Sequence, residues 1–111
     1  MKERDGVQRS EQWNQYYGKA HLENFQHHRS KFLVDPTELS MRKAALLRAM
    51  PRINNAIVLE VGSGKGEFAV ALAKLGAQVT GIDIGDDLIA LSQMVAKLNN
   101  VYCHFRVGCL P

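Results

Sequence analysis

The sequence is poor in cysteine, and its 111 residues include only Cys103 and Cys109. Two thiols are too few for a disulfide scaffold or a zinc knuckle, so we expect a protein of the reducing cytoplasm. No apolar run approaches the roughly 18–20 residues that cross a bilayer, and residues 1–10 are too polar for a secretory signal. These absences disfavour the membrane and disulfide-rich secreted classes.

The patterns that bind metals or nucleic acids are also missing. The four histidines lack ligand spacing on one helical face, so we expect no metal site. The net charge of +3 has its basic excess in residues 1–52, which contain ten Lys/Arg and six Asp/Glu. Residues 53–111 contain four Lys/Arg and five Asp/Glu. Such an excess is typical of a solvated helix surface, with an acidic substrate as the alternative, and without interleaved aromatics it does not favour nucleic acid.

What remains is an ordinary globular composition, with 46% hydrophobic and 23% charged residues, and the chain divides near residue 53. We interpret residues 1–52 as a helical lead-in. A first helix is predicted over residues 10–33, begun by Ser10. Its aromatic residues are either packing residues or the cover of a substrate pocket; they are Trp13, Tyr16 and Tyr17.

A second helix of the lead-in has a stronger start signal. Asp35 can cap a helix, Pro36 suits the first helical position, and Glu38 completes a capping box. This helix should end before Pro51, which cannot continue it.

Residues 53–111 alternate between strand and helix patterns. Residues 57–61 resemble a strand buried on both faces, and strands are also expected at 79–83 and 101–107. Helices are expected at 68–75, closed by Gly76, and from Asp86 or Asp87 to residue 98. The order predicts an α/β fold, part of a doubly wound Rossmann-like sheet with parallel strands, behind N-terminal helices.

The first strand-to-helix turn, residues 60–68, carries three alternate glycines that would let a ligand lie against the backbone. A Walker loop is excluded, because Leu59 stands where that motif needs glycine and Gly66 where it needs serine or threonine. The dinucleotide-binding pattern Gly-x-Gly-x-x-Gly matches at Gly62 and Gly64, but Glu67 stands where it needs the third glycine. The Glu67 carboxylate would also repel a pyrophosphate at the helix end. The loop is therefore shaped for a close ligand but poorly suited to a phosphate.

Asp83 ends the second expected strand, at the same edge of the sheet as the glycine loop. A carboxylate at that edge can accept both hydroxyl protons of a ribose. The alternative is a turn or capping aspartate, a task for which Asp86 and Asp87 are better placed. The combination of loop and acid favours a nucleoside ligand.

Together these residues resemble a known family. The pattern Glu60-x-Gly62-x-Gly64-x-Gly66, followed by Gly81-Ile82-Asp83, is similar to the cofactor-binding half of class I S-adenosylmethionine-dependent methyltransferases. The resemblance covers residues 56–108, and the lead-in carries no specific motif. It implies three sheet strands in the order 3-2-1, an S-adenosylmethionine cofactor and methyl transfer to a small-molecule acceptor.

The resemblance also implies roles for individual residues. Glu60 would lie near the methionyl ammonium, unless it merely bonds the loop amides, and Lys65 would be solvated or contact the carboxylate. Asp83 would hold the ribose, and Ile84 would lie against the adenine or belong to the core. The implied cofactor-binding set is Glu60, Gly62, Ser63, Gly64, Gly66, Asp83 and Ile84.

Two departures from the family shape the functional hypothesis. Cys109 follows Gly108 where many members carry an aspartate near the adenine, and only three of the family's seven strands are present. We therefore expect residues 53–111 to be an apparently truncated half domain that binds cofactor without turnover by itself. The alternatives are a non-enzymatic fragment that binds cofactor or a partner chain, and half of a nicotinamide-dependent enzyme. The open first strand would also favour self-association.

Overall fold

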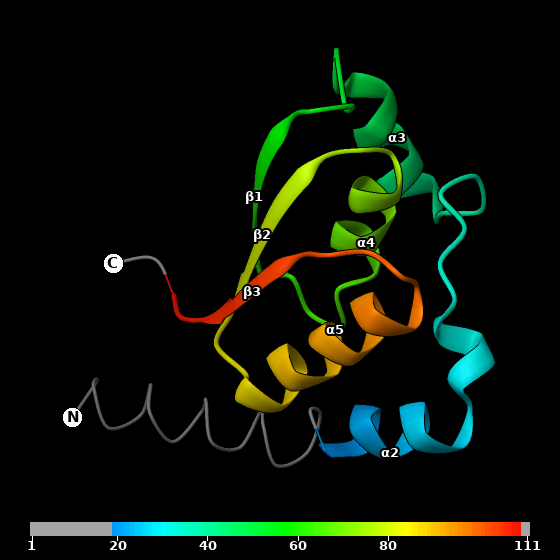
Figure 1. Cartoon of the computed structure of the whole chain (residues 1–111), viewed down its shortest axis with the longest axis vertical. Helices are drawn as coiled ribbons and strands as arrows, with labels where there is room; N and C mark the ends of the chain where they lie inside the picture. The colour runs from blue at the N-terminus through cyan, green and yellow to red at the C-terminus, as the bar shows by residue number, and fades with distance from the viewer. Residues whose placement is uncertain (1–18, 110–111) are drawn as a thin grey trace.

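The computed structural model describes residues 19–109 as a parallel sheet with helices packed against it (Figure 1). The strands lie in the order β1-β2-β3, which confirms the predicted order 3-2-1 and the partial Rossmann-like α/β fold. The elements of the sheet unit are β1 (Ile57–Val61), α4 (Glu67–Lys74), β2 (Gln78–Asp83), α5 (Asp86–Leu98) and β3 (His104–Val107). Both strand pairs are parallel, with Glu60 beside Gly81 and Gly81 beside Phe105.

The lead-in is broken into shorter helices than the sequence predicts. Ser10 and the three aromatic residues that follow it lie outside the described residues. The remainder forms α2 (Lys19–His27) and a 3₁₀ turn, η2 (Arg29–Phe32), so the expected helix over 10–33 ends at His27. The break folds Phe32 back onto Phe25, with ring centroids 5.1 Å apart in an edge-to-face arrangement.

The second lead-in helix, α3 (Met41–Ala49), begins later than expected. Asp35 does not cap it, because the Asp35 carboxylate closes a local turn by accepting from the backbone N–H and the hydroxyl of Thr37, at 2.9 and 2.7 Å. Ser40 takes the capping position instead, and its hydroxyl oxygen accepts from Lys43 N at 3.5 Å.

Asn99 fixes the lead-in to the sheet unit. Its buried side chain accepts from Val34 N at 2.8 Å and donates to the carbonyls of Phe32 and Val95, at 2.9 and 2.8 Å. Lys74 adds a bond from its ammonium to the Val34 carbonyl at 2.7 Å. The lead-in residues buried here share one core with α4 and α5, so the lead-in packs as part of the same body.

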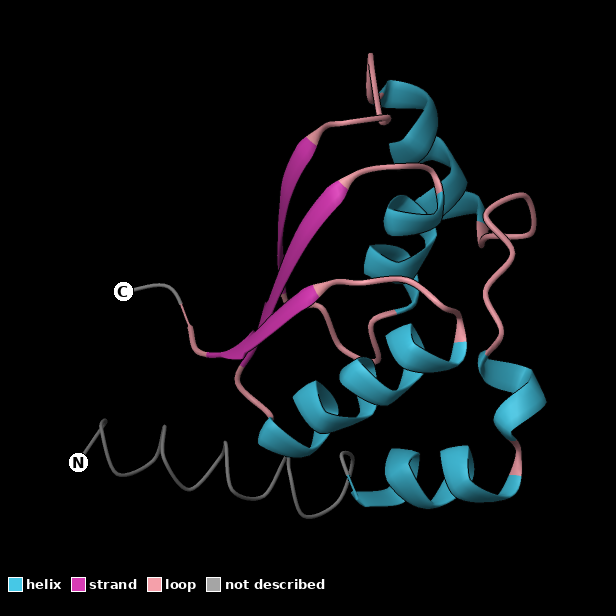
Figure 2. Cartoon of the chain, viewed as in Figure 1, coloured by secondary structure: helices cyan, strands magenta, loops and turns pink. Residues whose placement is uncertain are grey.

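Strand β1 differs from the sequence expectation of burial on both faces. Ile57, Leu59 and Val61 are 86%, 57% and 50% exposed, whereas Val58 packs against the core. The reason is visible in Figure 2, where the described helices lie on one side of the sheet. The apolar run of β1 is thus half solvated, and β1 is an edge strand of this sheet. Within residues 19–109 no helix is long and apolar enough to span a membrane.

Strand β3 is shorter than expected, and its residues alternate between buried and exposed. It begins at His104 rather than Val101, and Cys103 and Phe105 are buried while Tyr102, His104 and Arg106 are exposed. Cys103 is therefore a core residue, and burial raises the pKa of its thiol to about 11. Val107 is the exception to the alternation, because it is exposed at the end of the strand.

We expect the 111-residue chain to self-associate through the exposed face and open edge of β1. Unpaired strand groups beside apolar side chains are a template for a second chain. Light scattering over a concentration series should show species larger than the monomer. The pair Ile57→Lys and Leu59→Lys should shift them toward monomer, whereas Met41→Lys, at an equally exposed position on α3, should not. A monomer at every concentration would contradict this expectation.

Candidate functional site

The glycine loop between β1 and α4 lies directly on the end of β2. The backbone N–H groups of Gly62 and Ser63 both donate to the Ile82 carbonyl, at 2.8 and 3.0 Å. Gly62, Gly64 and Gly66 have φ of 78°, 55° and 81°, the left-handed region that glycine adopts at little cost. The loop is thus a compact turn whose shape requires these glycines.

The loop glycines have different surroundings. A Cβ at Gly62 or Gly64 would meet no atom within 4 Å, so the space beside both residues is open to a ligand. A Cβ at Gly66 would come within 2.9 Å of Ser92 Cβ and 3.2 Å of the Phe105 ring. Gly66 is therefore required by packing on α5 and β3, whereas Gly62 and Gly64 leave the outer side of the loop accessible.

Asp83 reaches the loop from the end of β2, as the predicted topology requires. Its Oδ2 accepts from Gly64 N at 2.8 Å and its Oδ1 accepts from Gly85 N at 3.1 Å. The sequence predicts Asp86 or Asp87 as the cap of α5, but the N-cap of this helix is Gly85. Asp83 closes the turn that leads into this helix. Each carboxylate oxygen can accept more than one hydrogen bond, so Asp83 retains capacity for a ligand.

Glu60 lies on the helix-covered face of β1 with its Oε1 buried and without a hydrogen-bond partner among the described residues. Burial raises the pKa of Glu60 to about 7; nearby Lys43 opposes that shift and Asp83 adds to it. The alternative that Glu60 bonds the loop amides is not what the structure shows, because those amides donate elsewhere. A buried carboxylate without a partner is suited to a cationic group.

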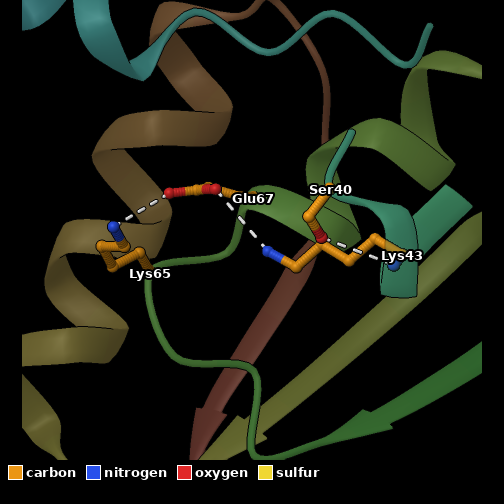
Figure 3. Close-up of polar contacts among 4 residues, drawn as sticks. All are labelled: Ser40, Lys43, Lys65 and Glu67. Carbon is orange, nitrogen blue, oxygen red and sulfur yellow. Dashed lines mark hydrogen bonds and ion pairs between the residues drawn. The ribbon is translucent and has the colours of Figure 1, made fainter. Parts of the chain in front are cut away.

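Glu67, the first residue of α4, lies between two lysines (Figure 3). Lys65 Nζ is 3.0 Å from its Oε1 and Lys43 Nζ is 3.6 Å from its Oε2. Burial alone would raise the pKa of Glu67, but both lysines outweigh it and lower that pKa. Lys65 is therefore paired within the protein, and the charge with which Glu67 would repel a phosphate is largely offset.

A different observation explains why this loop is unsuited to a pyrophosphate. Four of its backbone N–H groups already donate within the protein, those of Gly62, Ser63, Gly64 and Gly66. Phosphate-binding loops direct free N–H groups at the anion. The dinucleotide alternative is therefore opposed by the hydrogen bonds of the loop more than by Glu67.

A cavity of about 330 Å³ opens beside the loop, at the ends of the strands. It is lined by Val61, Gly62, Ile82, Asp83, Ile84, Gly108 and Cys109. Ile84 is 45% exposed there, so it is a wall of the cavity and not a core residue. A larger cavity of about 460 Å³ lies between α5 and β3, but it contains none of the predicted site residues.

The sequence does not single out three residues that lie beside the loop or its neighbours. Lys43 comes from the lead-in helix α3, Ser92 lies in the apolar stripe of α5, and the Phe105 ring lies beneath Gly66 and Gly81. Each is identified by its distance to the loop. Only the pairing of a glycine loop with a following buried helix could have pointed to Ser92.

Comparisons with known proteins agree with this geometry. Residues 58–110 match a family described as a methyltransferase domain. The chain is 41% identical over 74 residues to a putative protein N5-glutamine methyltransferase of Methanocaldococcus jannaschii, covering 66% of this chain and 36% of that protein. It is 40% identical over 52 residues to a ubiquinone biosynthesis O-methyltransferase of Xanthomonas campestris, covering 47% and 22%.

Solved structures give the same result. The chain resembles magnesium protoporphyrin IX methyltransferase of Synechocystis, solved with bound S-adenosylmethionine, with a TM-score of 0.53 and 28% identity over 59% of this chain and 33% of that one. The chain spans about a third or less of the length of the curated relatives named above. Residues 58–110 are therefore similar to the cofactor-binding part of class I, Rossmann-like S-adenosylmethionine-dependent methyltransferases.

Proposed function

We propose that residues 53–111 bind S-adenosylmethionine at the ends of β1 and β2, as the cofactor-binding portion of a methyltransferase. The observation that carries the proposal is the 2.8 Å contact between Asp83 and Gly64, which joins the predicted acid to the glycine loop beside an open cavity. The proposed contact residues are Glu60, Gly62, Ser63, Gly64, Gly66, Asp83 and Ile84. Gly66 and the buried Ser63 would act through the shape of the loop.

The charges at the site fit the amino-acid end of this cofactor. Glu60 Oε1 is a buried acceptor to which no group in the described part of the chain donates, and an ammonium group would supply that donor. The open space beside Gly62 and Gly64 would let the methionyl chain lie against the backbone. The residues present therefore fit a zwitterion better than a polyphosphate.

The nucleoside end fits the cavity. Asp83 stands at its wall with acceptor capacity for ribose hydroxyls, and Ile84 offers an exposed apolar surface for the base. Cys109 replaces the aspartate that many members of the family carry, so the adenine amino group would meet only a weak partner.

The cofactor supplies an activated methyl group when it is bound. The residues described here would hold and orient it, and such transfer depends on proximity and orientation more than on acid–base groups. We propose a small-molecule acceptor in the full enzyme, which the ubiquinone and protoporphyrin relatives support.

Calorimetry with the 111-residue chain tests the proposed function. We expect S-adenosylmethionine and S-adenosylhomocysteine to bind and nicotinamide dinucleotides to bind far more weakly, because four of the N–H groups of the loop already donate within the protein. Tighter binding of a nicotinamide dinucleotide would refute the proposal.

Asp83→Ala should weaken S-adenosylhomocysteine binding by roughly 1–3 kcal/mol, the scale of a hydrogen bond to a charged group. Because this substitution also frees Gly64 N, Asp83→Asn serves as a closer variant that keeps one acceptor oxygen and removes the charge. Asp86→Ala, at an exposed acid on the same turn, is the matched control and should bind normally. Unchanged affinity in folded Asp83→Ala would remove Asp83 from the site.

Binding should weaken as the pH falls through about 7. Glu60 becomes neutral below its pKa of about 7 and then attracts an ammonium less, so affinity should drop by up to about tenfold per pH unit. S-adenosylhomocysteine titrations between pH 5.5 and 7.5 would measure this. Glu60→Gln should bind weakly and abolish the pH dependence of the affinity. His21→Gln is the control, because it removes a histidine of α2 near Lys65 and Glu67, and it should keep the pH dependence. A wild-type affinity that is flat with pH would exclude Glu60 as the ammonium partner.

A further inference from the structure

The peptide groups of Gly64 are held from two different elements. Asp83, at the end of β2, accepts from Gly64 N at 2.8 Å. Ser92, in the middle of α5, donates its hydroxyl to the Gly64 carbonyl, also at 2.8 Å. Gly64 lies in the left-handed region with φ of 55°, and its outer side faces open space. A glycine whose outer side is open to a ligand is thus fixed on its protein side by two side chains.

Ser92 is an unusual residue for its position. It is 0% exposed and lies on the inner face of α5 among apolar side chains such as Leu91 and Val95. A buried hydroxyl is costly unless it is hydrogen-bonded, and within a helix it would ordinarily bond the carbonyl one turn earlier. Here it bonds the glycine loop instead, 28 residues away in the sequence.

The size of Ser92 is set by the same loop. A Cβ at Gly66 would lie 2.9 Å from Ser92 Cβ and 3.0 Å from its hydroxyl oxygen, so α5 touches the loop backbone at this residue. A side chain much larger than serine or cysteine would push the loop outward. Alanine would fit, but it would leave the Gly64 carbonyl without this donor.

We propose that Ser92 is a positioning residue of the cofactor site, an inference that rests on the function proposed above. By holding the Gly64 carbonyl, Ser92 presets the outer surface of the loop on which the methionyl chain would lie. Asp83 can then share its carboxylate between Gly64 N and the ribose hydroxyls without releasing the loop. The sheet and the following helix would thus each contribute one fixed bond to the same glycine.

Hydrogen–deuterium exchange by mass spectrometry tests the positioning on the free 111-residue chain. In Ser92→Ala, peptides covering residues 60–68 should exchange about tenfold faster, because loss of one hydrogen bond favours local opening. Peptides covering residues 69–75 should change little. Val95→Ala truncates another buried side chain of α5 and is the matched control, in which the loop should keep its protection.

Calorimetry with S-adenosylhomocysteine then separates a positioning role from a merely structural one. Ser92→Ala should weaken binding about five- to tenfold. The double variant Ser92→Ala, Asp83→Asn should lose less affinity than the product of the two single fold-losses, because both side chains act through Gly64. Ser92→Cys, with a weaker donor, should give intermediate exchange and affinity, and it replaces Ser92→Ala if that variant does not fold.

Unchanged loop exchange in folded Ser92→Ala would overturn the inference. Faster exchange with unchanged affinity would also overturn it, since Ser92 would then serve only the fold. If the unaltered chain does not bind S-adenosylhomocysteine, the proposed function fails with it, while the exchange data still decide whether Ser92 holds the loop.

Discussion

The contact of the Phe105 ring with two glycines is the constraint on which the site depends. Phe105 is buried on β3, and a Cβ at Gly81 would lie 2.8 Å from its ring, while one at Gly66 would lie 3.2 Å away. Only glycine at both positions lets β2 and the loop close over this ring. That closure brings Gly64 to within hydrogen-bond distance of Asp83 and Ser92, and so it sets the geometry of the whole loop.

The charged side chains around the loop depend on this geometry for their partners. The Glu60 Oε1 atom is buried and has no hydrogen-bond partner among residues 19–109, while the Glu67 carboxylate is paired with Lys43 and Lys65. Lys43 belongs to the lead-in, which is itself fixed by Asn99 and Lys74. The lead-in therefore adjusts the electrostatics of a loop that is distant from it in sequence.

The alternation of strands and helices and the meeting of the glycine loop with Asp83 could be predicted from the sequence. Both depend on local signals: apolar runs of strand length, alternate glycines, and the rule that parallel strands end at one edge. Which polar group would make which bond could not be predicted, because each polar side chain has several possible partners and the packing of distant segments selects among them. Asp35 bonds Thr37 rather than capping a helix, and Ser92 and Asn99 bond partners 28 and 65 residues away. The half exposure of β1 escaped prediction because an apolar run does not show how many faces are covered.

The most direct test of this account is the structure of the chain crystallised with S-adenosylhomocysteine. The account predicts that the ribose hydroxyls contact Asp83, that the amino group lies within hydrogen-bond distance of Glu60, and that the base lies against Ile84 in the cavity beside the loop. The bonds from Gly64 to Asp83 and Ser92 should persist in the complex. A ligand bound instead in the larger cavity between α5 and β3 would contradict the account.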